Sequence, residues 1–326
     1  MPSPVVLARV VRSGLEESVH LGDVAVVDAD GRVVASAGDP ERPLYARSSM
    51  KPLQATVSLS FTPFEFDDRE VAVMCASHNA EPIHVETVRS LLRRAGVSED
   101  SLQTPPARPW DDESLVADPK RRPINSDCSG KHGGMLAACR AQGWPAASYR
   151  DPGHPLQRAV LETVLAAAGV EDVHIGVDGC GVPVHGMPLR AMATIYARLA
   201  SPARLGGTEP FARRAIDAMT AQPYLVAGRN RPDTAVMQIV PGVAAKGGAE
   251  GLLCGALLGR GLGVAVKVRD GGAARAAGPA FIRTLEQLDA LTARHLFELA
   301  PFAAPPVLGG GAPVGSVVAD FDLNPA

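Results

Sequence analysis

Residues 46–54, Ala-Arg-Ser-Ser-Met-Lys-Pro-Leu-Gln, contain a serine and a lysine whose spacing suits nucleophilic catalysis. Ser48 and Lys51 lie three residues apart, so one helical turn starting at Ser48 would bring the amine beside the hydroxyl. The unpaired N–H groups at such a helix end could stabilise an oxyanion. The lysine can accept the serine's proton only in its neutral form, which requires burial or a nearby positive charge. The alternative is a capped surface helix with a solvated lysine.

Two further polar motifs follow in the chain, Ser77-x-Asn79 and Lys246-Gly-Gly. Together with Ser48-x-x-Lys51 they occur in the order of the Ser-x-x-Lys, Ser-Asp-Asn and Lys-Thr-Gly set of class A β-lactamases and penicillin-binding proteins. This order favours catalysis and predicts a second pair, Ser77 with Lys246, facing the first pair across a pocket. Two neighbouring lysines would favour the neutral amine that a base requires. The alternative is chance agreement of short patterns.

A third group of chemically active residues contains two cysteines. Cys128 and Lys131 are one helical turn apart in Cys-Ser-Gly-Lys-His-Gly-Gly-Met, and Cys180 follows a strand in the turn Asp-Gly-Cys-Gly-Val-Pro. Two thiolates with an imidazole or carboxylate would make a zinc site, although no Cys-x-x-Cys spacing occurs. A lysine ligand must first lose its proton, for which a metal can compensate. The alternative is ordinary buried cysteines, the interpretation we give to Cys75, Cys139 and Cys254.

Composition limits the possible function classes. The 326 residues suffice for one large or two fused domains, with 46% hydrophobic and 21% charged residues as in ordinary globular proteins. A net charge of -3 and 4% aromatic residues argue against nucleic acid or a membrane as partner. Neither a signal peptide nor a membrane-spanning run is readable. With five scattered cysteines, an odd number, the sequence predicts a cytoplasmic protein.

Strands at both ends of the chain and helices in its middle must position these residues. Apolar runs predict strands at 5–11, 16–20, 24–27, 33–37, 173–177 (buried), 235–240, 251–268 and 317–321. Periodic segments predict helices at 48–59, 81–95, 130–141, 154–168, 188–200, 209–220 and 273–291, and 70–75 as helix or strand. Residues 97–127 and 304–313 are predicted as loops.

This element order predicts an α+β fold in which the first and last strands join one antiparallel sheet. We expect a single unit over 1–326, with a sheet region from about 1–45 and 235–326 and a helical region over about 46–234.

The motifs resemble those of the Rhizobium etli-type L-asparaginases, the asparaginase II family. The resemblance lies in Ser-Ser-Met-Lys-Pro-Leu-Gln, Ala-Ser-His-Asn-Ala-Glu-Pro-x-His, Cys-Ser-Gly-Lys-His-Gly-Gly-Met-Leu, Asp-Gly-Cys-Gly-Val-Pro and Ala-Lys-Gly-Gly-Ala-Glu-Gly, spread over residues 46–251. It implies a fold like that of serine β-lactamases, penicillin-binding proteins and glutaminases, a homodimer, and hydrolysis of L-asparagine to L-aspartate and ammonia.

The resemblance also implies roles for individual residues. Ser48 with Lys51 and Ser77 with Lys246 match the two catalytic Ser–Lys pairs. A zinc site, one per subunit and not necessarily essential for the chemistry, is implied at Cys128, Lys131 and Cys180. The residues implied to lie at the substrate pocket are Arg47, Asp178, Asn79 and His132.

The sequence departs from the family pattern at two places, Ser126-Asp127 in place of His-Asn and Gly247 after Lys246 in place of Thr or Ser. The first bears on zinc affinity and substrate orientation, and the second on activity towards glutamine. Other acyl hydrolases on the same fold, a glutaminase, β-lactamase or peptidase, are the alternative enzymes. A non-catalytic zinc- or amino-acid-binding protein is the alternative of another class.

Overall fold

The structure, a computed structural model, describes residues 3–326 except the side chains at positions 273 and 274. Residues 1 and 2 therefore lie outside the described residues. They belong to the expected single unit and to the N-terminal stretch in which no signal peptide is readable. The chain forms two compact units, each described by itself. The sheet unit comprises Met1–Ser49, Met187–Ser201 and Ala235–Ala326, and the helical unit comprises Met50–Gly186 and Pro202–Thr234.

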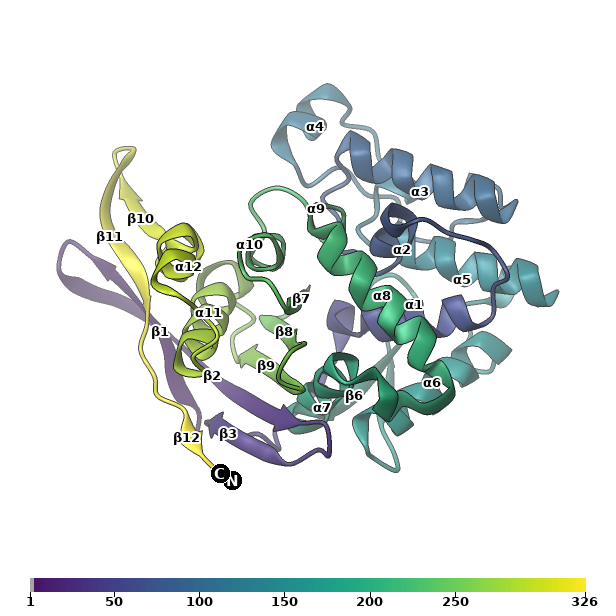
Figure 1. Cartoon of the computed structure of the whole chain (residues 1–326). Coiled ribbons are helices and arrows are strands. Elements are labelled where there is room, and N and C mark those ends of the chain that lie inside the picture. Colours follow the sequence, from purple (N-terminus) through teal and green to yellow (C-terminus); the bar gives the residue numbers. More distant parts are fainter. Residues whose placement is uncertain (1–2) are drawn as a thin grey trace. The chain divides into compact units, whose positions relative to one another are not determined.

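The sheet unit is built on an antiparallel sheet with the strand order β10-β11-β1-β2-β9-β8-β7 (Figure 1), and β3 pairs with β2 and β12. The N-terminal strand β1 pairs with the C-terminal strand β11, which confirms the predicted α+β class and the joining of the chain's two ends. The strands are β1 (Val5–Arg12), β2 (Leu15–Asp28), β3 (Val33–Ala37), β4 (Pro43–Tyr45), β7 (Val243–Gly248), β8 (Leu252–Leu257), β9 (Leu262–Val268), β10 (Pro306–Gly309), β11 (Ala312–Ala319) and β12 (Asn324–Pro325).

Two helices cover opposite faces of this sheet, and each packs closely against the sheet at a glycine. A Cβ at Gly255 would lie 2.4 Å from the Phe281 ring of α11 (Gly278–Gln287), and one at Gly263 would lie 2.0 Å from Ala193 O of α7 (Leu189–Ala200). Gly255 pairs with Val264, so Gly263 points to the other face because side chains alternate along a strand. The sheet unit therefore has three layers. Its remaining helices are α12 (Ala293–Glu298), α13 (Ala300–Ala303) and a π-helical turn (Ala273–Ala277).

The helical unit is organised around α1 (Lys51–Ser60), which packs against α2, α5, α6 and α8. Every residue from Lys51 to Leu59 is buried. The hydroxyls of Thr56 and Ser58 donate to carbonyls four residues earlier, at 2.9 and 3.0 Å, so this helix buries them without unpaired donors. The other helices are α2 (Asp68–Met74), α3 (Pro82–Ala95), α4 (Asp112–Ala117), α5 (Ser129–Gln142), α6 (Pro155–Ala168), α8 (Glu209–Ala221) and α9 (Pro223–Val226), with strands β5 (His174–Val177) and β6 (Pro183–Pro188).

Short 3-10 helices connect several of these elements, at Arg47–Met50, Glu99–Ser101, Pro123–Asn125, Ala146–Ser148 and Pro202–Thr208. The three cysteines predicted as core residues, Cys75, Cys139 and Cys254, are fully buried.

Several predicted elements differ from the structure. The helix expected at Ser48 begins at Lys51, because Arg47–Met50 forms a 3-10 turn and Met50 is the N-cap. The strand predicted over 235–240 is wrong, since this run belongs to α10 (Pro232–Ile239), and a short apolar run does not distinguish the two. The loop predicted over 304–313 contains β10, and α4 interrupts the loop predicted over 97–127. Strand β5 exists but is largely exposed, not buried as predicted.

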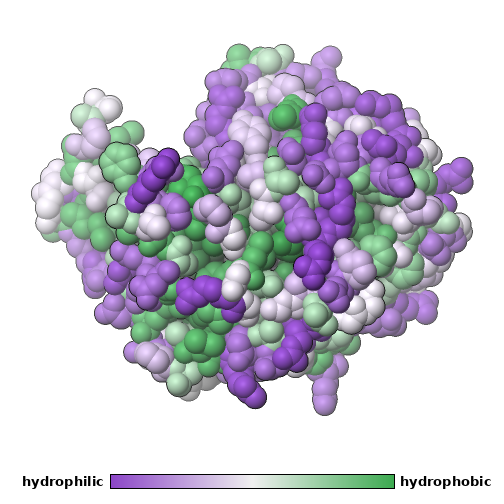
Figure 2. Space-filling view, viewed as in Figure 1, coloured by the Kyte–Doolittle hydropathy of each residue, from purple (hydrophilic) through white to green (hydrophobic). Residues whose placement is uncertain are grey.

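The described part of the chain contains no helix with the length and hydropathy needed to cross a membrane. Figure 2 shows hydrophilic side chains over much of one face, with hydrophobic ones interspersed.

The contact of Gly263 with α7 generates a prediction about stability. Gly263→Ala would place its methyl group 2.0 Å from Ala193 O and 2.3 Å from Ala197 N, so helix and sheet must separate. We expect a loss of about 2 kcal/mol or more in the free energy of unfolding, from urea titration. Gly259→Ala is the matched control, because no described heavy atom lies within 4 Å of its Cβ position. Equal midpoints for the two variants would contradict this packing.

Candidate active site

The Lys51 amine lies at the start of the central helix of the helical unit and is 0% exposed. Its Nζ lies 2.7 Å from Ala76 O, 3.2 Å from Asp127 O and 2.8 Å from Ser77 Oγ. The Asp127 carboxylate lies 3.5 Å away. Carbonyl oxygens only accept hydrogen bonds, so two N–H groups of Lys51 point at the two carbonyls. The third direction faces the Ser77 hydroxyl, to which an ammonium donates and from which a neutral amine accepts.

Ser77 is held by the backbone on both sides. Its N–H donates to Val226 O at 2.9 Å, and the Asn79 N–H donates to Ala227 O at 3.0 Å, so residues 77–79 lie extended beside residues 226–227. The side chain of His78 contacts Ser129 Oγ at 2.9 Å, and burial lowers the pKa of His78 well below its ordinary value. The hydroxyl of Ser77 is therefore presented to Lys51 by a fixed backbone.

Ser48 and its neighbour Ser49 have different surroundings within the sheet unit. Ser49 is buried, its Oγ donates to Lys246 O at 3.1 Å, and its carbonyl accepts from the Tyr196 hydroxyl at 2.7 Å. Ser48 is only half-buried. Ser49 therefore has a structural role, which leaves Ser48 as the serine of this stretch that is more accessible to a substrate. Whether Ser48 and Lys51 act as a pair stays a prediction.

Arg47 and Lys246 also belong to the sheet unit. Arg47 has a backbone φ of 45°, which is rare for a residue with a side chain, and its guanidinium lies 3.8 Å from Glu250. Lys246 lies on β7, is 0% exposed, and donates to Gly247 O at 2.6 Å. The predicted pairing of Lys246 with Ser77 stays a prediction, as does the role of Arg47 in the substrate pocket.

The structure brings Cys128, Lys131 and Cys180 together in the helical unit. Lys131 Nζ lies 3.0 Å from Cys180 Sγ, and the two thiols are hydrogen-bonded. The hydrogen bond from Cys128, with the nearby Lys131 ammonium, holds the pKa of Cys180 well below its ordinary value. Its partner Cys128 has a pKa well above the ordinary value, because it donates to Cys180 and is buried. The group is therefore a thiolate, an ammonium and a thiol.

Glycines explain how α5 can carry this group. A Cβ at Gly130 would lie 2.0 Å from Val73 O of α2, and one at Gly133 would lie 2.8 Å from the Leu91 side chain of α3. At Gly130 the contact is with backbone, so only glycine lets the first turn of α5 approach α2, whereas at Gly133 a side chain would require Leu91 to shift. The glycines of the Cys128 motif therefore position the neighbouring chemical groups.

His132 and Asp178 lie around the cysteine group. His132 Nδ1 lies 2.6 Å from the Tyr149 hydroxyl, and burial lowers the pKa of His132 to about 4. Its Nε2 is buried, and the nearby Cys180 sulfur partly opposes this lowering of the pKa. The Asp178 carboxylate lies 3.5 Å from Cys180 Sγ, and the Asp178 carbonyl closes the turn by accepting from the Gly181 N–H at 2.8 Å. Both residues predicted for the pocket thus neighbour the cysteine group.

Among the described residues, no three His, Cys, Asp or Glu side chains are grouped so as to hold a metal ion. The predicted zinc ligands include only two residues of these types, since the third is Lys131. The two thiols and the amine nevertheless fit a three-ligand site, because they already share contacts.

A cavity of about 440 Å³ adjoins these groups in the helical unit. Asp127 and Cys180 line it, and the run Pro-Pro-Ala-Arg-Pro-Trp at 105–110 contributes a wall. Because Asp127 contacts Lys51 and Cys180 contacts Lys131, the cavity lies beside both clusters.

Asn79 ties this wall to the Ser77 segment. Its carbonyl accepts from the Trp110 N–H at 2.9 Å, and its amide contacts Arg229 O at 3.0 Å and the Arg231 guanidinium at 3.3 Å. The Arg231 guanidinium in turn lies 5.9 Å from the centre of the Trp110 ring. These contacts make Asn79 a structural connector, and its predicted contact with substrate stays a prediction. Sequence reasoning missed the Trp110 wall, for which the tryptophan that follows three prolines in residues 105–110 was the available signal.

Comparison with known proteins identifies the family. The model of the family L-asparaginase II matches residues 8–319, nearly the whole chain. The chain belongs to the L-asparaginase II family. Its members are amidohydrolases, so the chain is an enzyme of the L-asparaginase type. No curated protein sequence matches the chain.

Solved structures similar to this family member include two β-lactamases and a glutaminase. A β-lactamase from Mycobacterium bovis shares 17% identity over 83% of this chain and 95% of its own, with a TM-score of 0.45. A putative β-lactamase from Bacteroides dorei shares 14% identity over 82% and 92%, with a TM-score of 0.48. A Bacillus glutaminase shares 12% identity over 82% and 91%, with a TM-score of 0.46.

Asn79 connects the Ser77 segment with Trp110 and with Arg229 and Arg231. The contacts of Glu81 support this connection and generate a prediction. Glu81 is buried, and its carboxylate accepts from the Arg229 N–H at 3.0 Å and from the Tyr224 hydroxyl. Glu81→Gln removes the negative charge and places an amide NH2 group, a hydrogen-bond donor, near the Arg229 N–H and the Tyr224 hydroxyl. We therefore expect a loss of about 1–3 kcal/mol in the free energy of unfolding. Glu86→Gln, at an exposed ion pair on the same helix, should change it by less than about 0.5 kcal/mol. Equal effects in urea titrations would rule out this role for Glu81.

Proposed function

We propose that this family member is an L-asparaginase that hydrolyses L-asparagine to L-aspartate and ammonia with serine–lysine chemistry. Family membership supports the reaction class. The observation that carries the chemistry is the buried Lys51 amine, whose Nζ lies 2.8 Å from Ser77 Oγ while two carbonyls occupy its other directions. A neutral lysine held in this way directs its lone pair at a hydroxyl proton, which is the arrangement that a general base requires.

In the proposed reaction Ser48 is the nucleophile. Its proton passes to Lys51 by way of the Ser77 hydroxyl as Oγ bonds to the side-chain amide carbon of asparagine, and backbone N–H groups near Ser48 hold the oxyanion. The C–N bond then breaks, the leaving nitrogen takes a proton from the lysine, and ammonia departs. Water attacks the resulting acyl-enzyme and gives a proton to the lysine. The bond between the acyl carbon and Ser48 Oγ then breaks, the lysine returns the proton to Ser48, and aspartate is released.

Ser77 and Lys246 act in this proposal as a relay. The Ser77 hydroxyl touches the Lys51 amine, so it can pass protons to and from the base. Lys246 is placed with Ser77 on the basis of the sequence motifs alone. Arg47, Asp178, Asn79 and His132 stay proposed pocket residues on the same basis.

Serine variants test which hydroxyl is the nucleophile. We expect Ser48→Ala to lower kcat for ammonia release from asparagine by at least about 1000-fold, because the acyl-enzyme cannot form. Ser77→Ala should slow turnover less and still accumulate acyl-enzyme, detected by mass spectrometry of quenched protein. Ser60→Ala, at the far end of α1, is the matched control and should keep normal turnover. Near-normal activity of Ser48→Ala with an inactive Ser77→Ala would make Ser77 the nucleophile.

The substrate class is tested on the wild-type protein with asparagine, glutamine and nitrocefin side by side. Faster ammonia release from asparagine than from glutamine, without nitrocefin hydrolysis, supports the proposal. A higher kcat/KM for glutamine would make the protein a glutaminase, and nitrocefin turnover would make it a β-lactamase. Binding of asparagine without any product would indicate a non-catalytic protein.

We also propose a zinc ion, one per subunit, held by Cys128, Lys131 and Cys180. The chemistry of this donor set supports it, since both thiols and the amine share contacts, although the amine must lose its proton to become a ligand. When bound, zinc would supply a positive charge beside the cavity that Cys180 lines. This charge would orient polar groups of the substrate rather than activate the hydrolytic water.

Chelation tests the part played by zinc. After exhaustive chelation we expect most of kcat to remain while KM for asparagine rises, because the charge contributes to binding and Ser48 and Lys51 carry the chemistry. Ammonia release is measured at saturating and at low asparagine, with zinc added back as control. Complete loss of turnover at saturating asparagine, reversed by zinc, would contradict this assignment.

The homodimer, the cytoplasmic location and the absence of a nucleic-acid partner also stay proposals that rest on the sequence and the family resemblance.

A further inference from the structure

Two arginines line the cavity beside Asp127. Ala107 and Arg122 form an antiparallel bridge, with N–H to O distances of 3.1 and 3.0 Å in the two directions. The bridge is isolated, so the pairing does not continue as a ladder, and Arg108 and Arg121 are the next residues on its two segments. Both side chains are exposed, and both line the 440 Å³ cavity.

Among the described residues, neither of these exposed guanidinium groups has a counter-ion. Within residues 3–326, the described contacts include no ion pair or hydrogen bond for Arg108 or Arg121. The acidic residue that lines the cavity, Asp127, already lies 3.5 Å from Lys51. The two positive charges thus line one cavity without a described carboxylate partner.

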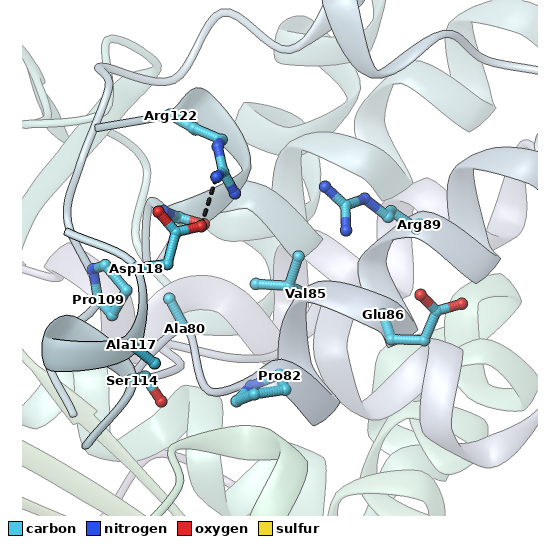
Figure 3. A pocket seen from close by; sticks show the side chains of 11 residues that line it. Ala80, Pro82, Val85, Glu86, Arg89, Pro109, Ser114, Ala117, Asp118 and Arg122 are labelled. Atoms are coloured by element: carbon cyan, nitrogen blue, oxygen red, sulfur yellow. Dashed lines mark hydrogen bonds and ion pairs between the residues drawn. The ribbon is translucent and has the colours of Figure 1, made fainter. Parts of the chain in front are cut away.

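A neighbouring cavity shows the ordinary arrangement for comparison. Figure 3 shows Arg122 turned towards Asp118 in this second cavity, which Arg89 also lines. Arg122 donates to Asp118, and Arg89 lies 2.9 Å from Glu99. Pro109 lines both cavities, so they lie on either side of the same short segment. The arginines of the second cavity thus form ion pairs with acidic residues of the protein, whereas Arg108 and Arg121 have no such partner among the described residues.

We propose that Arg108 and Arg121 bind the α-carboxylate of the substrate. The proposal rests on the proposed asparaginase function, from which it takes the identity of the anion. Guanidinium groups bind carboxylates through paired N–H···O bonds, and two of them can hold both oxygens. The bridge between Ala107 and Arg122 joins the two segments that carry them, and the adjoining wall is tied through Trp110 to Asn79, two residues from Ser77. An amide substrate anchored in this way is recognised as a free amino acid rather than as an amide within a peptide.

The test compares Arg108→Ala, Arg121→Ala and the double variant with Arg140→Ala. Arg140 is the matched control, since it is exposed on α5 and lines neither of these cavities. We expect the double variant to raise KM for asparagine on the order of 10- to 100-fold with kcat nearly unchanged, because charge-assisted hydrogen bonds are lost. Arg108→Lys and Arg121→Lys should have KM values for asparagine between those of wild type and the alanine variants, since an ammonium binds a carboxylate as a point charge.

A second experiment keeps the arginines and uses a substrate that lacks the α-carboxylate. Wild-type protein should prefer asparagine to 3-aminopropanamide, which lacks the α-carboxylate, and the double variant should lose most of that preference in kcat/KM. An unchanged preference, or the same KM in the double variant as in Arg140→Ala, would overturn the proposal and leave the asparaginase function standing.

Binding of L-aspartate, measured by calorimetry, gives a readout that needs no turnover. The double variant should bind aspartate at least about 10-fold more weakly than wild type, and added salt should weaken wild-type binding. Arginine-dependent binding in a protein that releases no ammonia would keep the carboxylate site and refute the asparaginase function. Equal affinities in wild type and double variant would refute the site.

Discussion

The burial of the Lys51 amine is the constraint on which the candidate site depends. An amine with no exposed surface must have all its hydrogen-bonding directions occupied, since an unpaired buried group costs several kcal/mol. The carbonyls of Ala76 and Asp127 and the hydroxyl of Ser77 meet this need. Those three groups come from two segments, so the loop after α2 and the turn before α5 must both end within about 3 Å of one nitrogen.

The glycines at the start of α5 make this convergence possible. Gly130 lies against the backbone of Val73 in α2, where any side chain would force the two helices apart. If they separated, Asp127 would move away from Lys51, and Cys128 and Lys131 would move with it. The same close packing therefore holds the serine–lysine contact and the thiolate–ammonium group in place. It explains why glycines alternate with chemically active residues in this motif.

The motifs predict which residues make up the candidate site, among them Lys51, Ser77, Cys128, Lys131 and Cys180, but they do not predict the contacts between these residues. Most helices and strands are predicted by periodicity. The contact of Lys51 with Ser77 joins residues that are separated in the chain by α1 and α2. A motif spacing therefore cannot predict it. The helix over Pro232–Ile239 was predicted as a strand for a related reason. Its apolar run suits either structure, and tertiary packing decides between them.

The charges around the cavity explain what kind of ligand the site accepts. The Lys51 amine lies beside the Asp127 carboxylate, and the Lys131 amine beside the Cys180 thiolate, so each buried amine has an anionic partner within its own cluster. Arg108 and Arg121 break this pattern among the described residues, because both line the cavity without an acidic partner. A neutral amide that carries one carboxylate supplies the missing charge without disturbing the two internal pairs. A second carboxylate, as in the product aspartate, would add a negative charge near Asp127, which favours its release after hydrolysis.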